Sequence, residues 1–473
     1  MVFSSLIFIF CFLPIFFLFY YLADKRYKNA VILAGSIFFY SWGAPRFIFV
    51  ILGTTVIDFY IVRAMSGATR SNLRKLLLCI SLSINLGLLF YFKYSNFFIE
   101  NVNILLRSFG TKPLGWTRLL LPIGISFYTF ETLTYVVDVY RRVHKPLRNF
   151  WDYQLYIILF PKLIAGPIIQ FHDFAEQIYD HTDFETIDNR LKGLYRFFIG
   201  LGKKVLIANV IGLAADTIFG MPTHSLGTAT AWFGALSYTM QIYFDFSGYS
   251  DMAIGLGMMM GFRFPENFNN PYTALSITDF WRRWHITLGK WMRNYLYIPM
   301  GGNRVSNPRM YLNLWLVFLA SGLWHGAAWG FIIWGAYHGA FLVIERIFLS
   351  KWLAKLGKAA FIYTFIVVAI GWVFFRTEHL STATGYLSRM FTWHTDASTW
   401  KPDNEYFTTL GIALLFSFFT LSGWGERIQQ KVFYSEYSMK LHYVMAFVAI
   451  ALCLISAGRI TVSTFNPFIY FRF

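Results

Sequence analysis

Residues 3–22 read FSSLIFIFCFLPIFFLFYYL, an apolar run without a single charged side chain. An α-helix of about 20 apolar residues crosses the hydrocarbon core of a bilayer, so this run predicts a membrane-spanning helix. The stretch 2–23 is longer than the apolar part of a signal peptide, and it lacks a basic flank and a small-residue cleavage site. We therefore expect it to stay attached as the first membrane helix.

Similar apolar runs recur along the whole chain. The clearest are 29–43, 47–64, 76–92, 118–139, 152–170, 227–247, 311–329, 331–349, 360–375, 407–422 and 442–457. A further run, 193–216, is interrupted by Gly200-Leu201-Gly202-Lys203-Lys204 and is expected to bend there. These runs predict an all-α, polytopic transmembrane protein with about eleven crossings plus re-entrant and interfacial helices. No stretch is typical of a second, soluble domain, so we expect one membrane domain over 1–473.

Composition and charge support this class. Hydrophobic residues make up 56% of the chain and charged residues 14%, whereas soluble domains are about one quarter charged. The net charge of +17 comes from basic clusters in short loops between the apolar runs. That placement favours the positive-inside bias over a nucleic-acid surface, so we expect the lipid bilayer, and no nucleic acid, as a partner. With the loops 24–28 and 65–75 in the cytoplasm, the N-terminus lies outside and an odd number of crossings leaves the C-terminus inside.

Metal and disulfide chemistry find no support in the sequence. Cys11, Cys79 and Cys453 lie singly in apolar runs, which predicts buried free thiols. The sequence has no HExxH motif, P-loop, GxSxG elbow or Rossmann fingerprint. We therefore expect no metal in the site.

Two carboxylates stand at the end of an apolar run, in the segment 241–252. Asp245 and Asp251 lie six residues apart there. A charge at the bilayer centre costs at least about 2.5 kcal/mol, so such residues usually line cavities or pair with cations. One reading is that they shape a substrate cavity or pair with arginines. The other is that one of them lies at the interface and caps a helix beginning at Met252.

The region 260–310 is polar although apolar runs flank it, and it needs a cavity or an interface. Read as one helix, 278–304 places Trp281, Trp284, Leu288 and Trp291 near one face, with Thr278 and Asp279 as the N-terminal cap. This pattern predicts an amphipathic helix that lies at the membrane surface or re-enters it. His285 stands beside the tryptophan stripe, either as a hydrogen-bonded interfacial residue or as a functional one.

Two further histidines each precede a glycine in the apolar segment 321–339. A neutral imidazole can accept or give a proton near pH 7, and its burial costs less than burial of a charge. Small residues beside His325 (Gly322, Gly326 and Ala327) let a substrate or a neighbouring helix approach the ring. A single buried histidine is more often structural than catalytic, and this applies to His338 even more than to His325.

Taken together, these segments resemble the membrane-bound O-acyltransferase family, in particular its bacterial alginate O-acetyltransferase branch. The resemblance begins at Met1-Val-Phe-Ser-Ser and covers nearly the whole chain. It is carried by Leu121-Pro-Ile-Gly-Ile-Ser-Phe-Tyr, Ala165-Gly-Pro, Tyr243-Phe-Asp-Phe-Ser-Gly-Tyr-Ser-Asp-Met-Ala-Ile-Gly, Phe280-Trp-Arg-Arg-Trp-His-Ile, Gly322-Leu-Trp-His-Gly and the aromatic tail Asn466-Pro-Phe-Ile-Tyr-Phe-Arg-Phe. Each piece alone is weak, but the combination in this order is specific.

The resemblance implies helices around a central funnel, with the site region in about 240–340. By position in Trp-His-Gly, His325 corresponds to the family's catalytic histidine, and His285 to a second polar site of this branch. In these motifs and in the segment 278–304 we assign substrate binding to Asp245, Asp251, Arg283, Trp324 and Asn303.

The implied activity is O-acetylation of an exopolysaccharide, alginate or a similar polymer such as cellulose. The expected donor is acetyl-coenzyme A on the cytoplasmic side of the bacterial inner membrane. A periplasmic acetyltransferase is the expected partner protein, and its hydroxyl or the polymer is the immediate acceptor.

Three other functions remain open. D-alanyl transfer to teichoic acids and O-acetylation of peptidoglycan are enzymatic alternatives within the same family. A transporter with a polar pathway is a non-enzymatic alternative, but the sequence shows no matching halves.

Overall fold

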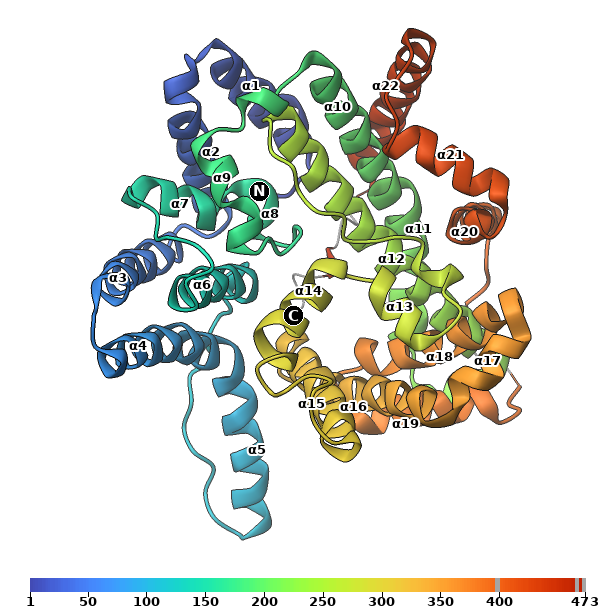
Figure 1. Ribbon diagram of the computed structural model, residues 1–473. Coiled ribbons are helices and arrows are strands. Elements are labelled where there is room, and N and C mark those ends of the chain that lie inside the picture. Colours follow the sequence, from blue (N-terminus) through green and yellow to red (C-terminus); the bar gives the residue numbers. More distant parts are fainter. Residues whose placement is uncertain (396–399, 464–467, 470–473) are drawn as a thin grey trace. The chain divides into compact units, whose positions relative to one another are not determined.

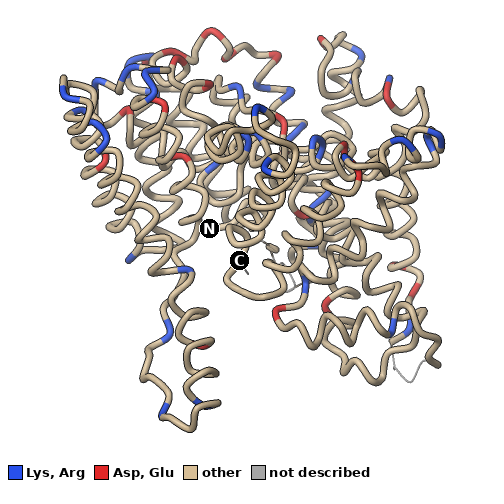
Figure 2. Tube along the Cα trace, turned by 60° about the horizontal axis from the view of Figure 1, so that its bottom comes forward, with Lys and Arg blue, Asp and Glu red and all other residues tan. Residues whose placement is uncertain are grey.

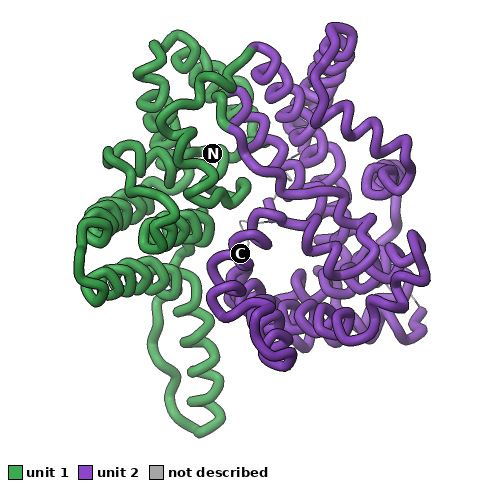
Figure 3. The backbone as a smooth tube through the Cα atoms, viewed as in Figure 1, with its two compact units in different colours: residues 1–186, 260–262 green, residues 187–259, 263–473 purple. Residues whose placement is uncertain are grey.

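The computed structural model describes residues 1–395, 400–463 and 468–469. Regular structure in these residues is helical throughout, apart from an isolated antiparallel bridge between Phe268 and Trp284. The helices group into two compact units, one made of Met1–Thr186 with Met260–Phe262 and the other of Ile187–Met259 with Arg263–Phe473 (Figures 1 and 3). Each unit is described by itself.

The first unit consists of nine α-helices and short linking turns. They are α1 (Leu13–Leu22), α2 (Lys28–Gly43), α3 (Ile48–Gly67), α4 (Ser71–Leu89), α5 (Ser95–Ser108), α6 (Ile125–Tyr140), α7 (Phe150–Ile158), α8 (Phe160–Leu163) and α9 (Phe171–Tyr179). A π-helical turn, Phe8–Phe12, precedes α1 and begins a buried cluster of phenylalanine rings. Phe160 lies at its centre, with its ring centroid 5.2 Å from that of Phe16 and 5.4 Å from that of Phe39.

Two predicted spans of this unit are wrong in extent. The run 118–139 is helical only from Ile125, because Gly124 turns the chain with φ +77° and a Cβ there would lie 2.7 Å from the carbonyl oxygen of Leu163. The run 152–170 is not one helix, since α7 ends at Ile158 and the chain turns at Leu159. Pro161 has no N–H to continue a ladder, and the amide of Phe160 donates to Oγ of Ser36 at 3.1 Å instead.

The second unit holds thirteen α-helices among its described residues. They are α10 (Ile187–Gly202), α11 (Asn209–Phe219), α12 (Thr228–Met259), α13 (Ile277–Arg283), α14 (Ile286–Trp291), α15 (Asn307–His325), α16 (Trp329–Ile344), α17 (Ser350–Leu356), α18 (Ala360–Arg376), α19 (Leu380–Phe391), α20 (Asn404–Phe418), α21 (Gly423–Phe433) and α22 (Met439–Val462). The longest, α12, has 32 residues and most of them are buried.

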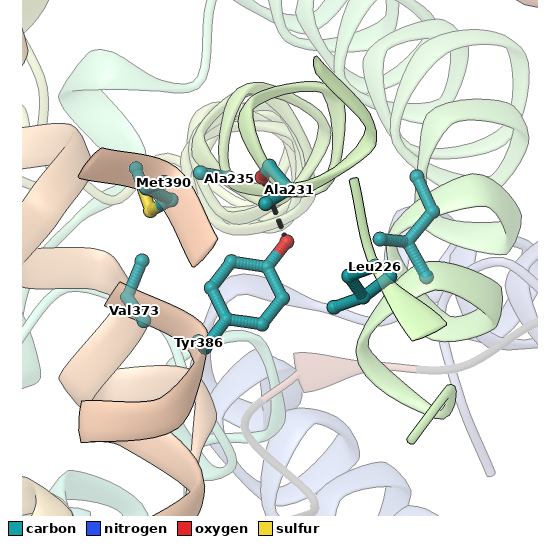
Figure 4. Packing of buried hydrophobic residues seen from close by; sticks show 7 residues of the cluster. Leu226, Ala231, Ala235, Val373, Tyr386 and Met390 are labelled. Carbon is teal, nitrogen blue, oxygen red and sulfur yellow. Dashed lines mark hydrogen bonds between the residues drawn. The ribbon is translucent and has the colours of Figure 1, made fainter. Parts of the chain in front are cut away.

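Apolar packing fixes one end of α12 against α18 and α19. Tyr386 of α19 is 1% exposed, and its hydroxyl donates to the carbonyl oxygen of Ala231 at 2.8 Å (Figure 4). Val373 of α18 and Met390 of α19 lie in the same cluster. The cluster therefore ties α18, which lies against the candidate site, to α12.

Five helical segments of the described residues are long and apolar enough to cross a membrane. They are Ile48–Gly67, Ser71–Ser108, Ile187–Phe219, Trp329–Arg376 and Met439–Val462, and the pair Asn404–Leu421 and Gly423–Phe433, bent by 98°, makes a sixth if it is one broken span. Figure 2 shows charged residues mainly at helix ends and in loops. The predicted all-α polytopic membrane class is confirmed, whereas the predicted count of about eleven crossings is not.

The predicted bend in 193–216 appears as a π-helical turn, Lys203–Ala208, between α10 and α11. The predicted single helix over 278–304 is wrong. It breaks at His285, which adopts a left-handed conformation with φ +45° and ψ 53° between α13 and α14. Its N-terminal cap is also different, because Oγ of Ser276, and not Thr278, accepts from the amide of Asp279.

Candidate active site

Two buried histidines lie close together in the second unit. His325 is the last residue of α15, and His285 directly precedes α14. Their ring centroids are 6.4 Å apart, and the residues are 4% and 1% exposed. Trp324 lies against both rings, at 4.9 Å from His325 and 6.1 Å from His285. The structure therefore brings together residues that are forty positions apart in the chain.

Close packing of α15 on α16 places His325. A Cβ on Gly322 would overlap the carbonyl oxygen of Phe331, and a Cβ on Gly335 would overlap that of Phe318. Glycines on both sides let the two backbones approach, as small residues do in membrane helix pairs. The small residues beside His325 thus admit a neighbouring helix, which is one of the two roles expected from the sequence.

Aromatic rings enclose His325. Trp334 lies edge-on at 5.3 Å and Phe375 at 5.1 Å from its ring centroid. Such walls keep water away and strengthen electrostatic interactions inside the site. A proton acceptor in these surroundings acts on a bound group instead of on bulk water.

His285 is held by the segment that follows α12. Its Nδ1 lies 3.0 Å from Oδ1 of Asn267, and the amide of Ile286 donates to the carbonyl oxygen of Asn267 at 2.9 Å. Phe246 of α12 packs edge-on against the ring at 4.7 Å. Burial lowers the pKa of His285 to about 3, so the ring is neutral at pH 7.

A glycine contact brings α10 and α12 together beside this site. A Cβ on Gly193 would lie 2.6 Å from the carbonyl oxygen of Gly255, and a Cβ on Gly200 would lie 2.5 Å from that of Gly248. The seven-residue spacing on both helices keeps these contacts on one face of each. Charged residues between the glycines on one helix therefore face those on the other.

These charged residues form a buried network. Arg196 of α10 donates to Asp251 at 2.9 and 3.0 Å and also pairs with Glu266. Lys203, in the π-helical turn, pairs with the second oxygen of Asp251 at 2.6 Å, and Lys204 pairs with Asp245 at 2.8 Å. The sequence left two interpretations of Asp245 and Asp251 open. In the structure both carboxylates pair with cations. Neither residue caps a helix, since both lie inside α12.

Asp245 also anchors part of the aromatic tail. The amide of Ile469 donates to its Oδ2 at 2.8 Å, and Phe468 stacks on Tyr249 at 4.6 Å. Both tail residues are buried, at 6% and 4% exposure. Of the tail 466–473, only Phe468 and Ile469 are among the described residues.

A cavity of about 510 Å³ adjoins the network and lies between α10, α12, α20, α21 and α22. Apolar side chains form most of its wall. The polar lining includes Arg196, Lys203, Ser247, Ser250, Asp251 and Asn267. Because the cations of the lining pair with Asp251 and Glu266, the cavity favours an uncharged group over an anion.

The remaining predicted site residues have partners elsewhere. Arg283 pairs with Asp279 one turn earlier on α13, at 3.0 Å. Asn303 lies in an exposed turn, where its Oδ1 accepts from the hydroxyl of Tyr297 at 2.6 Å. No cluster of three or more His, Cys, Asp or Glu suited to a metal occurs among the described residues.

Four residues of the site and of the adjoining network were not predicted from the sequence. Trp334 lies within the segment 321–339 and Asn267 within the polar region 260–310, but neither was assigned a role, and Phe375 and Arg196 lie outside both segments. The polar character of 260–310 is a signal for Asn267. For the other three the sequence carries none, since apolar helices hold many aromatic residues and their surfaces many arginines.

Known proteins resemble this chain over its full length. The profile of the membrane-bound O-acyltransferase family (MBOAT) matches residues 141–380. A Pseudomonas putida protein named probable alginate O-acetylase is 41% identical over 493 aligned residues, covering 100% of both chains. A protein of the same name from Pseudomonas aeruginosa is 46% identical over 397 residues, covering 84% of this chain and 76% of the relative. A peptidoglycan O-acetyltransferase of Helicobacter pylori is 38% identical over 425 residues, covering 82% and 80%.

Proposed function

Because this chain belongs to the membrane-bound O-acyltransferase family, we propose that it acetylates an exopolysaccharide from a cytoplasmic acetyl donor, with His325 as the catalytic base. The chain is an O-acyltransferase and a multi-pass membrane protein. The observation that carries the proposal is the buried pair of His285 and His325, 6.4 Å apart, inside the region that matches the family.

Acetyl groups and a polysaccharide acceptor are supported by the relatives. Those named for alginate O-acetylation align over most or all of both chains. The proposed polymer is therefore alginate or a similar one such as cellulose. The peptidoglycan O-acetyltransferase of H. pylori also aligns over most of its length, so peptidoglycan is the second candidate acceptor. The proposed location is the bacterial inner membrane.

The reaction requires few groups. The acceptor hydroxyl attacks the carbonyl carbon of the acetyl thioester while its proton passes to His325. The carbon–sulfur bond breaks, and the departing thiolate receives that proton, so His325 is restored. Acetyl-coenzyme A is the proposed donor, and its uncharged, amide-containing arm suits a cavity whose charges are paired among themselves.

The immediate acceptor is a hydroxyl of a periplasmic acetyltransferase or of the polymer itself. A partner protein is needed if the polymer does not reach the buried histidines. Aromatic walls around His325 favour a reaction without water, which would otherwise hydrolyse the thioester.

The test is transfer of label from radiolabelled acetyl-coenzyme A by the purified protein in nanodiscs. Oligomannuronate, cello-oligosaccharide and glycan strands of peptidoglycan are offered as acceptors, each with and without the periplasmic acetyltransferase. Wild type is compared with His325→Ala and with His224→Ala, whose histidine is exposed in a turn. We expect His325→Ala to reduce transfer by about 10²- to 10⁴-fold and His224→Ala to leave it unchanged.

Three outcomes contradict the proposal. Equal transfer by His325→Ala removes the catalytic role of this histidine. Label that reaches only peptidoglycan replaces the proposed acceptor. Transfer from a D-alanyl carrier-protein thioester, with none from acetyl-coenzyme A, assigns the chain to D-alanyl transfer.

A further inference from the structure

The side chain of Asn267 joins the cavity to His285. Asn267 is 1% exposed and contributes to the cavity wall. Its Oδ1 lies 3.0 Å from Nδ1 of His285 and accepts from Oγ1 of Thr287 at 3.0 Å. Its Nδ2 has no hydrogen-bond partner in the described part of the chain. The Nδ2 atom is itself fully buried, so a ligand in the cavity does not reach it, and Oδ1 is the end of the side chain that acts on the site.

A backbone amide identifies the two ends of the Asn267 side chain. The amide of Thr287 donates to Oδ1 at 3.4 Å. A backbone N–H can only donate, so the atom that it meets must be the carbonyl oxygen of the side chain and not its NH₂ group. The Nδ2 end is therefore the one without a recorded partner.

The same oxygen determines the tautomer of His285. A carbonyl oxygen only accepts, so Nδ1 of the imidazole must carry the hydrogen that joins them. In a neutral ring, Nε2 then carries the lone pair. His285 can accept a hydrogen bond or a proton at Nε2, but it cannot donate from that nitrogen as an oxyanion hole would require.

Backbone pairing holds this arrangement in place. The amide of Ile286 donates to the carbonyl oxygen of Asn267 at 2.9 Å, and the amide of Asn269 donates to that of Arg283 at 2.9 Å. Phe268 and Trp284 form the antiparallel bridge between them. The left-handed conformation of His285 follows from this pairing, because the chain must turn from α13 into α14 at that point.

We propose that Asn267 is a positioning residue for the acyl transfer proposed above, on which this inference rests. Its Oδ1 holds His285 as the Nδ1–H tautomer. His285 then offers Nε2 as an acceptor toward the protonated His325. One amide thus sets the protonation pattern of the histidine pair.

The titratable group that faces His285 is His325, at 6.4 Å between ring centroids. Charged residues of the surrounding elements are engaged with one another or exposed. Asp245 pairs with Lys204, Asp251 and Glu266 pair with Arg196, Arg283 pairs with Asp279, and Arg282 and Lys290 are exposed. A new charge at position 267 would therefore act on His285 directly.

The first experiment reads the tautomer without any activity. Imidazole ¹⁵N spectra of the protein in nanodiscs are recorded at pH 7, and His285 is assigned by its absence in His285→Gln. We expect a protonated Nδ1 and an unprotonated Nε2 in wild type, and loss of this pattern in Asn267→Leu. A wild-type ring protonated at Nε2 overturns the inference, whether or not acetyl transfer is observed.

The second experiment separates positioning from a merely structural role. Asn267→Leu is expected to lower kcat by about 10²-fold. Asn267→Asp keeps an acceptor for Nδ1, so it restores kcat at high pH, while its carboxylate moves the acidic limb of kcat/KM to higher pH by raising the pKa of His285.

Asn270→Gly is the matched control. Asn270 lines the same cavity three residues later, donates to Gln429 at 2.7 Å, and has a left-handed φ of +47° that glycine tolerates. We expect an unchanged pH profile. If Asn267→Leu and Asn267→Asp lose kcat equally, and the acidic limb of kcat/KM does not move in Asn267→Asp, then Asn267 has only a structural role. If the wild-type protein transfers no acetyl group, the proposed function is refuted. The tautomer of His285 can still be tested by the ¹⁵N spectra.

Discussion

Gly200 of α10 and Gly248 of α12 touch backbone to backbone, so that a Cβ on Gly200 would lie 2.5 Å from the carbonyl oxygen of Gly248. This contact, with its counterpart between Gly193 and Gly255, sets the separation at which Arg196 reaches Asp251. The ion-pair network beside the cavity therefore depends on residues that have no side chain.

Alanine at position 200 is expected to push the two helices apart. Overpacking in a tight contact costs about 1–3 kcal/mol, so Gly200→Ala should lower Tm in detergent and reduce acetyl transfer. Gly411→Ala is the matched control, because a Cβ there meets nothing within 4 Å. It should raise stability by about 0.5–1 kcal/mol, since glycine is unfavourable inside a helix. Equal Tm values for the two variants would contradict the role of the contact.

The same network makes Asp251 sensitive to neutralisation. Asp251→Asn leaves Lys203 without its recorded carboxylate and removes one of the two from Arg196. Breaking a buried ion pair costs roughly 3–5 kcal/mol, so we expect a large fall in Tm. On α10, Asp188 pairs with Lys192 and with His442, but its side chain is 42% exposed. Asp188→Asn should cost at most about 1 kcal/mol. An equal fall in Tm for Asp251→Asn and Asp188→Asn would show that burial adds nothing to the stability of the ion pairs of Asp251.

The bend of the first helix in the second unit shows how far prediction from sequence can reach. Glycines and two lysines within an apolar run predict an interruption, and a π-helical turn follows at Lys203–Ala208. The partners of the lysines could not be predicted, because Asp245 and Asp251 lie more than forty residues away. Local sequence predicts where a helix is interrupted, whereas tertiary contacts determine which residues the side chains at the interruption bind.

The region around His285 shows where prediction fails. Tryptophans at helical spacing favour one continuous helix over 278–304, yet the chain breaks at His285. The break is stabilised by Asn267, eighteen residues earlier, through a side-chain contact and backbone pairing. Motifs identified His285, His325 and Trp324, which the structure brings together, but not Asn267, which stands in none of them.

Acid is expected to destabilise the first unit through His181. Burial lowers the pKa of His181, against the opposing effect of Glu185, with smaller effects from Lys28 and Asp180. In the unfolded chain, His181 takes up a proton near its ordinary pKa of about 6.5. In the folded chain it takes up the proton only at a lower pH. The stability is therefore present above that pH and is lost as the pH falls below it.

The measurement is Tm in detergent at pH 8 and pH 5 for wild type and His181→Phe. Phenylalanine keeps the stack on Phe262, whose ring centroid lies 4.3 Å away, but cannot take up a proton. We expect Tm to fall less in the variant than in wild type. Groups that titrate elsewhere act on both proteins alike, so parallel losses would refute the assignment to His181.

His338 is predicted to be dispensable although it is fully buried near the site. It is 0% exposed, and neither ring nitrogen has a hydrogen-bond partner among the described residues. A buried polar group without a partner costs about 1–3 kcal/mol, which an apolar side chain avoids. The ring of His338 packs tightly on Gly371, because a Cβ built on Gly371 would lie only 2.7 Å from Nε2 of His338. The larger ring of phenylalanine would not fit there, so leucine is the better substitution. His338→Leu is therefore expected to keep Tm and to retain acetyl transfer.

Comparison of acetyl transfer by His338→Leu and His325→Ala shows which of the two buried histidines takes part in the reaction. Trp334 lies between the two histidines, 5.2 Å from the ring of His338 and 5.3 Å from that of His325. If His338→Leu folds normally but loses transfer, His338 acts on the reaction through Trp334. His338→Gln would then recover activity only if a polar group is what the position needs. If transfer stays intact while His325→Ala is inactive, the chemistry belongs to His325 and not to buried histidines of this unit in general.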